Sequence, residues 1–301
     1  MNVALIMPVH NGLVHLKRFL PTVESAINRA SNDSDVHYSI IITDDGSTDG
    51  TSELLEKNHP NVQIVKGDGN LWWSGGVTRG TKYAIENLKP DGILLWNNDI
   101  LPHDSFFQRL SARIKKIDTD VILGATICDL SDPDKIWSMG GIFNPRTGKK
   151  YMLGLDKKPP LNTYKDIEAD WLTGMGTYIP AKVFKTVGYW NAKDFPQYFG
   201  DADFTYRAKK QGFKLIVDPT LILYNDTENS GMLHQGSYKK LLESFVSIRS
   251  KYNIQKEIKF YRFYATSPLP CFYLFGKYFK YVGGFFKWKI LNLLNIHKTQ
   301  A

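Results

Sequence analysis

Three clusters of carboxylate and amide side chains follow apolar segments of the sequence and could do chemistry. The first, residues 44–49 (DDGSTD), comes directly after the apolar run at residues 38–42. Carboxylates at the end of a strand accept hydrogen bonds from a uracil or thymine imide and from ribose hydroxyls, whereas a phosphate site offers backbone N–H groups. A turn followed by a helix N-cap explains the same residues without a ligand, and both interpretations stay open.

The second cluster, residues 96–99 (WNND), ends another apolar run and offers one carboxylate and two amides. Mg²⁺ and Mn²⁺ prefer oxygen ligands, and they take few of these from protein carboxylates when diphosphate and water supply the rest. The pattern therefore predicts Asp99 as a metal ligand, with an Asx-type turn as the alternative.

The third cluster, residues 198–208 (YFGDADFTYRA), comes after the small-residue stretch 173–177 (TGMGT). Asp201 stands where a helix is expected to begin, and a carboxylate at such a helix end could activate a hydroxyl as a general base. The alternatives are an N-cap at Asp201 and an ordinary i, i+4 surface pair between Asp203 and Arg207.

Other chemistries are excluded by what the sequence lacks. No Gly-x-Gly-x-x-Gly follows the first apolar run and no Gly-x-x-x-x-Gly-Lys-Ser/Thr occurs, so neither a dinucleotide dehydrogenase nor a P-loop ATPase is expected. Two cysteines give no disulfide framework, and a 43% hydrophobic content excludes a disordered chain. A zinc site is not expected either, because these histidines lack ligand spacing: His10, His37, His103, His234 and His297.

Strand-like and helix-like segments alternate through the first third of the chain. This alternation predicts right-handed crossovers and a mostly parallel sheet, with a ligand crevice at the carboxyl ends of its strands. The predicted strands are residues 3–7 (ended by Pro8), 38–42, 62–65 and 93–96, and the predicted helices are residues 13–30, 48–57 and 76–88.

Beyond residue 98 the pattern loosens. A Gly/Pro/Lys-rich segment at residues 140–160 is predicted to be a hairpin or a mobile loop. The remaining predictions are helices at residues 104–117, 180–187 and 201–211 and strands at residues 121–125, 214–217 and 221–224.

Taken in order, the clusters resemble the motifs of the family 2 nucleotide-sugar glycosyltransferases, which have the GT-A fold. The resemblance runs from Val3 to about Asp226. It rests on residues 8–11 (PVHN), similar to Pro-x-x-Asn; 44–49, similar to Asp-Asp-Gly-Ser-x-Asp; 69–76 (GNLWWSGG), similar to a Gly-rich loop before a helix; 97–99 (NND), similar to Asp-x-Asp; 171–174 (WLTG), similar to the acceptor-side motif; and 201–203 (DAD), similar to Glu-Asp-x-Asp.

The resemblance implies a role for each matched residue. It implies that Asp201 is the catalytic base and that Asp99 binds Mg²⁺ or Mn²⁺. The implied nucleotide-binding residues are Pro8, Asn11, Asp44, Asp45, Gly75, Gly76 and Asn98, and the implied acceptor-binding residues are Trp171, Thr173, Gly174 and Asp203.

The sequence departs from the family pattern at two places. Gly200 replaces the usual Glu before the base, and Asn225-Asp226 stands where many members place a metal-contacting His. The NND form and the GNLWW loop are most similar to the rhamnosyltransferase-like branch that builds bacterial surface polysaccharides, a branch that also includes hexosyltransferases. Trp72 and Trp73 are predicted to pack in the core or loop rather than to form a sugar platform.

The C-terminal region is basic and aromatic. From Lys239 onward, twelve Lys or Arg residues face only Glu243 and Glu257, a balance of +10 that leaves −2 of the chain's +8 for residues 1–238. Residues 260–294 interleave thirteen aromatic side chains with lysines, too many charges for a core helix or a transmembrane span. The pattern predicts an interfacial segment on an anionic membrane, and packing as buried core is the alternative.

We therefore expect an α/β protein with a GT-A catalytic domain at residues 1–235 and a helical, membrane-associating region at residues 236–301. Residues 1–100 would bind the nucleotide and residues 101–235 the acceptor. The expected enzyme is an inverting, metal-dependent hexosyltransferase that uses a UDP- or dTDP-sugar, with dTDP-rhamnose as a candidate. Its acceptor would be a growing, lipid-linked bacterial glycan. A sugar nucleotidyltransferase and a non-catalytic nucleotide-sugar-binding protein are the alternatives.

The expected location is the cytoplasmic face of the plasma membrane. The N-terminal segment has no basic leader, and its apolar run is too short for a signal peptide. The slightly acidic body argues against nucleic-acid binding.

Overall fold

The computed structural model describes residues 1–159, 165–226 and 237–293 of the chain, so the predicted positions of His234, His297 and Leu294 lie outside the described residues. The chain divides into two compact units. Unit 1 comprises Met1–Ile142 and Tyr151–Asn229, and unit 2 comprises Phe143–Lys150 and Ser230–Ala301.

Unit 1 is built on one mixed sheet in the order β10-β12-β6-β11-β4-β1-β2-β3, with β5 and β7 added at its margins. Strands β3, β2, β1 and β4 run parallel, β11 runs antiparallel to β4 and β6, and β6 and β12 are parallel. The bounds are β1 Asn2–Val9, β2 His37–Asp44, β3 Gln63–Lys66, β4 Gly92–Leu95, β5 Ile100–Pro102, β6 Val121–Asp129, β7 Ile136–Ser138, β10 Ile167–Glu168, β11 Tyr178–Pro180 and β12 Lys214–Asn225. The predicted mostly parallel sheet is confirmed.

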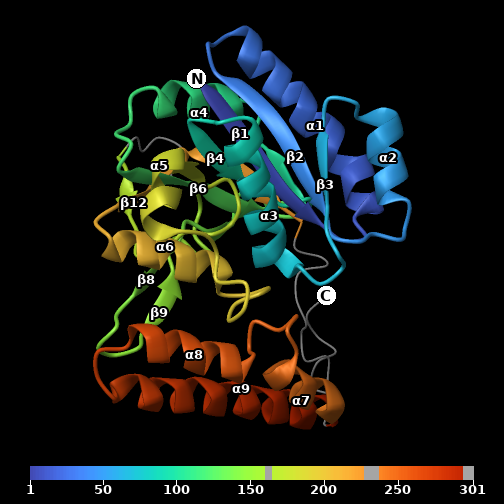
Figure 1. Cartoon of the computed structure of the whole chain (residues 1–301). Coiled ribbons are helices and arrows are strands. Elements are labelled where there is room, and N and C mark those ends of the chain that lie inside the picture. The colour runs from blue at the N-terminus through green and yellow to red at the C-terminus, as the bar shows by residue number, and fades with distance from the viewer. Residues whose placement is uncertain (160–164, 227–236, 294–301) are drawn as a thin grey trace. The chain divides into compact units, whose positions relative to one another are not determined.

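Helices cover both faces of this sheet (Figure 1). Alternate residues of each strand point to opposite faces, so Val3 and Leu5 join one apolar cluster while Ala4 and Ile6 join the other. The first cluster contains side chains of α1 Leu13–Asn32, α2 Thr51–Asn58 and α4 Phe106–Ile114, and the second contains side chains of α3 Trp72–Asn87, α5 Ala181–Val187 and α6 Gly200–Lys210. This three-layer packing explains the continuous apolar runs of the central strands.

Several element boundaries differ from the sequence prediction. Strand β1 continues through Pro8, which pairs in register with Thr43 on β2. On the β4 side the pairing has already ended at Ile6. The missing N–H of the proline therefore leaves no hydrogen bond to β4 unmade. Two predicted short strands form the single strand β12, with an irregularity between Val217 and Ile222.

The parallel strands place the candidate site. Because β1, β2 and β4 run in the same direction, the segments that follow them emerge at one edge of the sheet. These are the segments that contain Asn11, Asp44 and Asp99.

Unit 2 contains α7 Tyr238–Val246, α8 Ile254–Tyr264 and α9 Leu269–Leu293, with the loop of the hairpin β8 Gly141–Phe143 and β9 Lys150–Met152. The predicted hairpin within residues 140–160 is therefore confirmed. Asn253 caps α8, because its side-chain oxygen accepts the backbone N–H of Lys256 at 3.0 Å. None of the helices in the part of the chain that the structure describes is long and apolar enough to cross a membrane.

Candidate active site

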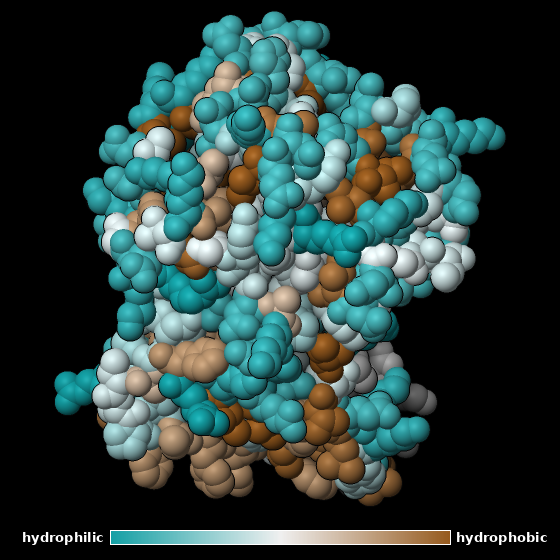
Figure 2. Space-filling model, viewed as in Figure 1, coloured by the Kyte–Doolittle hydropathy of each residue, from teal (hydrophilic) through white to brown (hydrophobic). Residues whose placement is uncertain are grey.

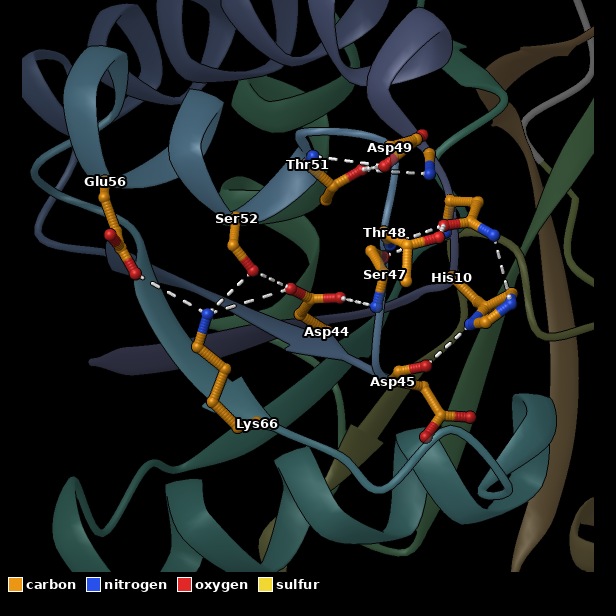
Figure 3. Close-up of polar contacts among 12 residues, drawn as sticks. His10, Asp44, Asp45, Ser47, Thr48, Asp49, Thr51, Ser52, Glu56 and Lys66 are labelled. Carbon is orange, nitrogen blue, oxygen red and sulfur yellow. Dashed lines mark hydrogen bonds and ion pairs between the residues drawn. The ribbon is translucent and has the colours of Figure 1, made fainter.

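Asp44 is held by the loop that it begins (Figure 3). Its Oδ1 accepts the backbone N–H of Ser47 at 3.0 Å, its Oδ2 accepts the hydroxyl of Ser52, and Lys66 Nζ lies 3.8 Å from Oδ2. Burial acts to raise the pKa of this carboxyl, but the two serines and the lysine outweigh it and hold the pKa below its ordinary value. Asp44 is therefore an ionised, buried acceptor.

Asp45 organises the beginning of α3. Its Oδ1 accepts the backbone N–H of Gly69 at 2.8 Å, and its Oδ2 accepts those of Leu71 and Trp72 at 2.9 and 3.1 Å. These bonds satisfy amides that precede or begin the helix, which explains why α3 starts at Trp72 rather than at the predicted Gly76. Both oxygens of Asp45 are thus engaged by the chain itself.

The turn after β1 is tied to the loop after β2. Asn11 has a left-handed backbone with φ 52°, and its Oδ1 accepts the N–H of Thr48 at 2.8 Å while its own N–H donates to Ser47 Oγ at 2.8 Å. A Cβ added at Gly12 would lie 2.7 Å from Nδ2 of Asn98, so the turn after β4 packs against the turn after β1. The structure therefore brings Asn11, Asn98 and the Asp44 loop together, as predicted for one edge of the sheet.

Glycines bring α3 close to this edge. A Cβ at Gly76 would lie 2.8 Å from Cβ of Pro8, and a Cβ at Gly75 would lie 3.1 Å from Cβ of Leu71. The lack of a side chain at Gly76 therefore lets the helix approach the end of β1, whereas the contact at Gly75 is with the residue that precedes the helix.

Asp99 is partly buried, and one of its carboxylate oxygens is fully buried. Its Oδ1 has no hydrogen-bond partner among the described residues, and its backbone oxygen accepts the N–H of Asp226 at 2.9 Å. Burial raises the pKa of Asp99 to about 6, with a further increase from the charge of Asp226 and opposing effects from its own backbone N–H and His15. Arg18 Nη1 lies 2.8 Å from Oδ2 of Asp226. His15, Arg18 and Asp226 were not predicted as site residues.

The side chains near Asp99 determine what kind of divalent cation site could form there. Among residues 1–159, 165–226 and 237–293, no group of three or more His, Cys, Asp or Glu side chains is placed to hold a metal ion. Asp99 nevertheless offers a buried carboxylate oxygen without a protein partner. This arrangement fits a cation that takes one protein carboxylate and completes its shell with diphosphate and water, rather than a cage of protein ligands.

Asp201 lies in the first turn of α6 and contacts the acceptor-side segment. Phe199 precedes the helix in a left-handed conformation, φ 67°, and this turn sets the direction in which α6 starts. Asp201 Oδ2 accepts the N–H of Gly174 at 3.2 Å, and Thr205 Oγ1 links the backbone oxygen of Asp201 to the N–H of Leu172. The structure thus joins two motifs that are nearly thirty residues apart in the chain.

Asp203 faces the interior rather than a cleft. Its side chain is 1% exposed, and its Oδ2 accepts Nε of Arg207 at 3.0 Å. Arg207 also donates to the backbone oxygens of Val187 and Tyr189 at 2.8 Å. The i, i+4 pair exists, but it is a buried brace between α6 and the segment after α5, not the surface pair considered from the sequence.

The other acceptor-side residues are also largely buried. Trp171 is 6% exposed and packs on Gly141, where an added Cβ would lie 2.3 Å from the indole ring. Thr173 is 5% exposed, and its backbone oxygen accepts the hydroxyl of Thr177 at 2.7 Å. Contact of Trp171 and Thr173 with an acceptor stays a prediction.

Gly200 has a steric reason to replace glutamate. A Cβ at this position would lie 2.0 Å from Oγ of Ser74 and 3.0 Å from the backbone oxygen of Phe195. Ser74 donates from its hydroxyl to that same Phe195 oxygen at 2.6 Å and from its N–H to Pro196 at 2.8 Å. A serine on α3 therefore occupies the space next to Asp201, the predicted base.

Trp73 connects several parts of the site, a role that the sequence did not indicate. Its indole N–H donates to Oδ1 of Asn97 at 3.0 Å, and its backbone N–H donates to Oε1 of Gln197 at 3.2 Å. A Cβ at Gly174 would lie 2.1 Å from its ring. Trp73 therefore packs as predicted, and it also contacts the turns that carry Asp99 and Asp201.

Tyr198 lies in the third cluster, but the sequence analysis gave it no role. Burial raises the pKa of its phenol, and the negative charges of Asp99 and Asp201 raise it further. The phenol of Tyr198 therefore lies within electrostatic range of both the predicted metal ligand and the predicted base. Its position as the first residue of the third cluster was the signal in the sequence.

Comparison with known proteins identifies the class. Residues 4–167, more than half of the chain, match the model of glycosyl transferase family 2. The chain belongs to this family and is a glycosyltransferase. The match ends before Asp201, so the assignment of the base depends on the geometry described above and on the sequence resemblance.

The relatives agree with this assignment. The chain is 24% identical over 237 residues to an N-acetylglucosaminyl-diphospho-decaprenol L-rhamnosyltransferase of Mycobacterium tuberculosis. The aligned region covers 72% of this chain and 74% of that protein. The fold is similar to that of GalNAc-T7 solved with UDP, GalNAc and Mn²⁺, with a TM-score of 0.57 and 15% identity over 75% of this chain and 44% of that one. It is also similar to a mannosyltransferase from Pyrobaculum calidifontis in complex with GDP-Man and Mn²⁺, with a TM-score of 0.55 and 13% identity over 89% of this chain and 66% of that one. The predicted GT-A fold is confirmed.

Proposed function

We propose that this glycosyltransferase moves a sugar from a UDP- or dTDP-sugar, with dTDP-rhamnose as the first candidate, to a hydroxyl of a growing, lipid-linked bacterial surface glycan. The name of the mycobacterial relative supports this donor and acceptor class, because it combines an L-rhamnosyltransferase with N-acetylglucosaminyl-diphospho-decaprenol, a lipid-linked sugar. The observation that supports this chemistry is the position of Asp201 in the first turn of α6, where its carboxylate accepts the backbone N–H of Gly174 in the predicted acceptor-side segment.

The proposed reaction is a single displacement with inversion. Asp201 accepts the proton of the acceptor hydroxyl, whose oxygen forms a bond to the anomeric carbon as the bond from that carbon to the diphosphate oxygen breaks. The proton resides on Asp201 and the electron pair on the departing nucleoside diphosphate. No covalent bond between sugar and enzyme forms. The hydrogen bond from Gly174 stabilises the ionised form of Asp201 and orients its carboxylate before the reaction.

Asp99 would hold Mg²⁺ or Mn²⁺ through its unpartnered oxygen. Such a cation, when bound, neutralises the charge that develops on the departing diphosphate. The Mn²⁺ in the two similar structures supports this proposal.

Residues 1–100 are proposed as the nucleotide-binding half and residues 101–235 as the acceptor-binding half. Asn11, Asn98 and the loop that begins at Asp44 lie at one edge of the sheet, next to Gly75 and Gly76. The two carboxylates of this loop already accept several bonds from the chain, so we propose that they shape the nucleoside site as well as contact the base or ribose. A cytoplasmic location, peripheral at the inner face of the plasma membrane, is part of the same proposal, because a lipid-linked acceptor would lie there.

A panel of nucleotide sugars tests this function without the acceptor. We expect a UDP- or dTDP-sugar to bind and to be hydrolysed slowly, with release of the nucleoside diphosphate, in a reaction that EDTA suppresses. Binding without any hydrolysis or transfer would favour a non-catalytic sugar-binding protein. Formation of a nucleotide sugar from sugar phosphate and nucleoside triphosphate would instead identify a nucleotidyltransferase.

A further inference from the structure

One side of helix α9 packs against other residues of unit 2. Lys277 Nζ lies 2.6 and 2.7 Å from the carboxylate oxygens of Glu257 on α8, and the hydroxyl of Tyr278 donates to the same carboxylate at 2.8 Å. The ring of Tyr281 stacks on that of Tyr252 with centroids 3.9 Å apart, and Phe285 is fully buried. These contacts fix which side of α9 faces α7 and α8.

The opposite side of α9 is apolar and exposed. Six side chains along it range from 45% to 85% exposed: Phe272, Phe275, Phe279, Phe286, Ile290 and Leu293. At 100° per residue they fall within a sector of about 60°, and at 1.5 Å per residue they extend over about 31 Å. We call these six residues the α9 stripe. Figure 2 shows the corresponding hydrophobic colour over the part of the molecule where Figure 1 draws α9.

No part of the described chain covers the stripe. A Cβ built at Gly276 or Gly283, two glycines in the same part of the helical circumference, meets no atom within 4 Å. Soluble proteins rarely leave aromatic rings exposed to water over such a length. Contiguous apolar patches of this kind mark interaction surfaces.

The charges beside the stripe indicate what binds it. Helix α9 contains four lysines and no acidic residue, and Lys280 and Lys287 are exposed at one border of the stripe. If a second copy of the chain covered the stripe, the lysines at its border would face the lysines of the other copy, and α9 offers no acidic side chain to pair with them. A surface that is apolar below and anionic at its boundary satisfies both features, because rings enter the acyl region while lysines meet phosphates.

We infer that the α9 stripe docks unit 2 on an anionic lipid bilayer, with the helix lying in the plane of the interface. The inference narrows the sequence-based prediction of an interfacial segment at residues 260–294 to the exposed side of α9. Five of the thirteen rings in that segment, Phe260, Tyr261, Tyr264, Tyr278 and Phe285, instead hold the helices of unit 2 together or bind the loop 143–150. The surface goes beyond the glycosyl transfer proposed above and does not depend on the identity of donor or acceptor.

Vesicle co-sedimentation of the full-length protein tests the inference. We expect binding to vesicles of phosphatidylglycerol and phosphatidylcholine at low salt, and much weaker binding to phosphatidylcholine alone or at high salt. F275S/F279S should reduce the partition coefficient at least roughly tenfold, because two rings leave the acyl region. K280Q/K287Q should reduce it roughly fivefold per lysine on anionic vesicles only.

Val14→Ser is the matched control, since Val14 is 75% exposed on α1 in unit 1 and should not change binding. Circular dichroism melts check that every variant is folded, which is expected because the substituted rings are exposed. The inference is overturned if the wild-type protein ignores anionic vesicles at low salt, or if F275S/F279S binds them as well as Val14→Ser does. A dimer in size-exclusion chromatography that F275S/F279S converts to monomer would show that a second copy covers the stripe instead. Donor hydrolysis in solution reports the catalytic proposal separately, so failure of one is distinguishable from failure of the other.

Discussion

The carboxylates of the candidate site differ between its two sides. On the side of the β2 loop, Asp44 and Asp45 together accept bonds from four backbone N–H groups and one serine hydroxyl. On the side of α6 and the turn after β4, Asp99 keeps a buried oxygen without a hydrogen-bond partner among the described residues, and Asp201 accepts the backbone N–H of Gly174 at 3.2 Å. The same residue type thus stabilises the fold on one side, and on the other side it occupies the positions proposed for the metal ligand and the base.

This difference separates two kinds of mutational effect. Removing a carboxylate that satisfies buried amides leaves donors unpaired and lowers the free energy of unfolding. Removing a carboxylate that is buried without partners costs little stability, because its ionised form was already disfavoured by desolvation. Activity and stability should therefore respond to different aspartates.

The largest effect is expected at Asp201. Asp201→Asn removes the proton acceptor while it keeps the shape of the side chain, so kcat should fall at least roughly 100-fold with donor affinity near that of the wild-type protein. Steady-state kinetics and donor titration measure the two quantities. Asp203→Asn, which alters the buried brace to Arg207, should instead lower the melting temperature. An active Asp201→Asn together with a folded but inactive Asp203→Asn would show that the base is the other carboxylate.

Asp99→Ala should weaken cation-dependent donor binding roughly 10- to 100-fold, because the cation would lose its carboxylate anchor. The variant should melt no lower than the wild-type protein, since the lost oxygen has no partner among the described residues. Calorimetric titration of the donor with and without Mg²⁺ measures the loss. If EDTA leaves wild-type turnover unaffected, Asp99 has no metal role.

Asp45→Asn should act on stability. The amide nitrogen would replace an oxygen that accepts one or two backbone N–H groups, so we expect a loss of about 2 kcal/mol in the free energy of unfolding. Chemical denaturation measures this loss. Asp68→Asn is the control, because Asp68 is exposed and accepts the N–H of Asn70, its one hydrogen bond among the described residues, so stability should change by less than about 0.5 kcal/mol. Equal effects of the two substitutions would remove the distinction between the two sides of the site.

The sequence predicted the alternating strands and helices of residues 1–100 and the edge at which the polar clusters meet, because hydrophobic periodicity indicates the elements and parallel crossovers bring the strand ends to one edge. It did not predict where α3 begins, because the bonds from Asp45 that start this helix span more than twenty residues. The steric reason for Gly200 was equally hidden, since Ser74 lies far away in the chain. Contacts of this kind have no local pattern.

The C-terminal region, residues 236–301, shows the same limit of prediction from the sequence. Its composition predicted an interfacial segment, but composition did not separate rings that pack on Glu257 and its neighbours from rings that face outward. That separation depends on which side of α9 the neighbouring helices cover.

A smaller effect is expected at Trp73. Trp73→Phe keeps the ring but removes the indole N–H that positions Asn97, so kcat/KM should fall roughly three- to tenfold. Trp190→Phe is the matched control, because the indole nitrogen of Trp190 is buried without a hydrogen-bond partner among the described residues. Equal losses of activity in both variants would mean that packing, not the bond to Asn97, is what the site requires.

The anomeric configuration of the released sugar tests the proposed chemistry most directly. Water can replace the acceptor, so proton NMR at early times, before mutarotation, can follow the sugar set free from the donor that binds. A single displacement assisted by Asp201 predicts a sugar with the configuration opposite to that of the donor. A sugar that retains the donor's configuration would require a second displacement, and it would contradict the role assigned to Asp201.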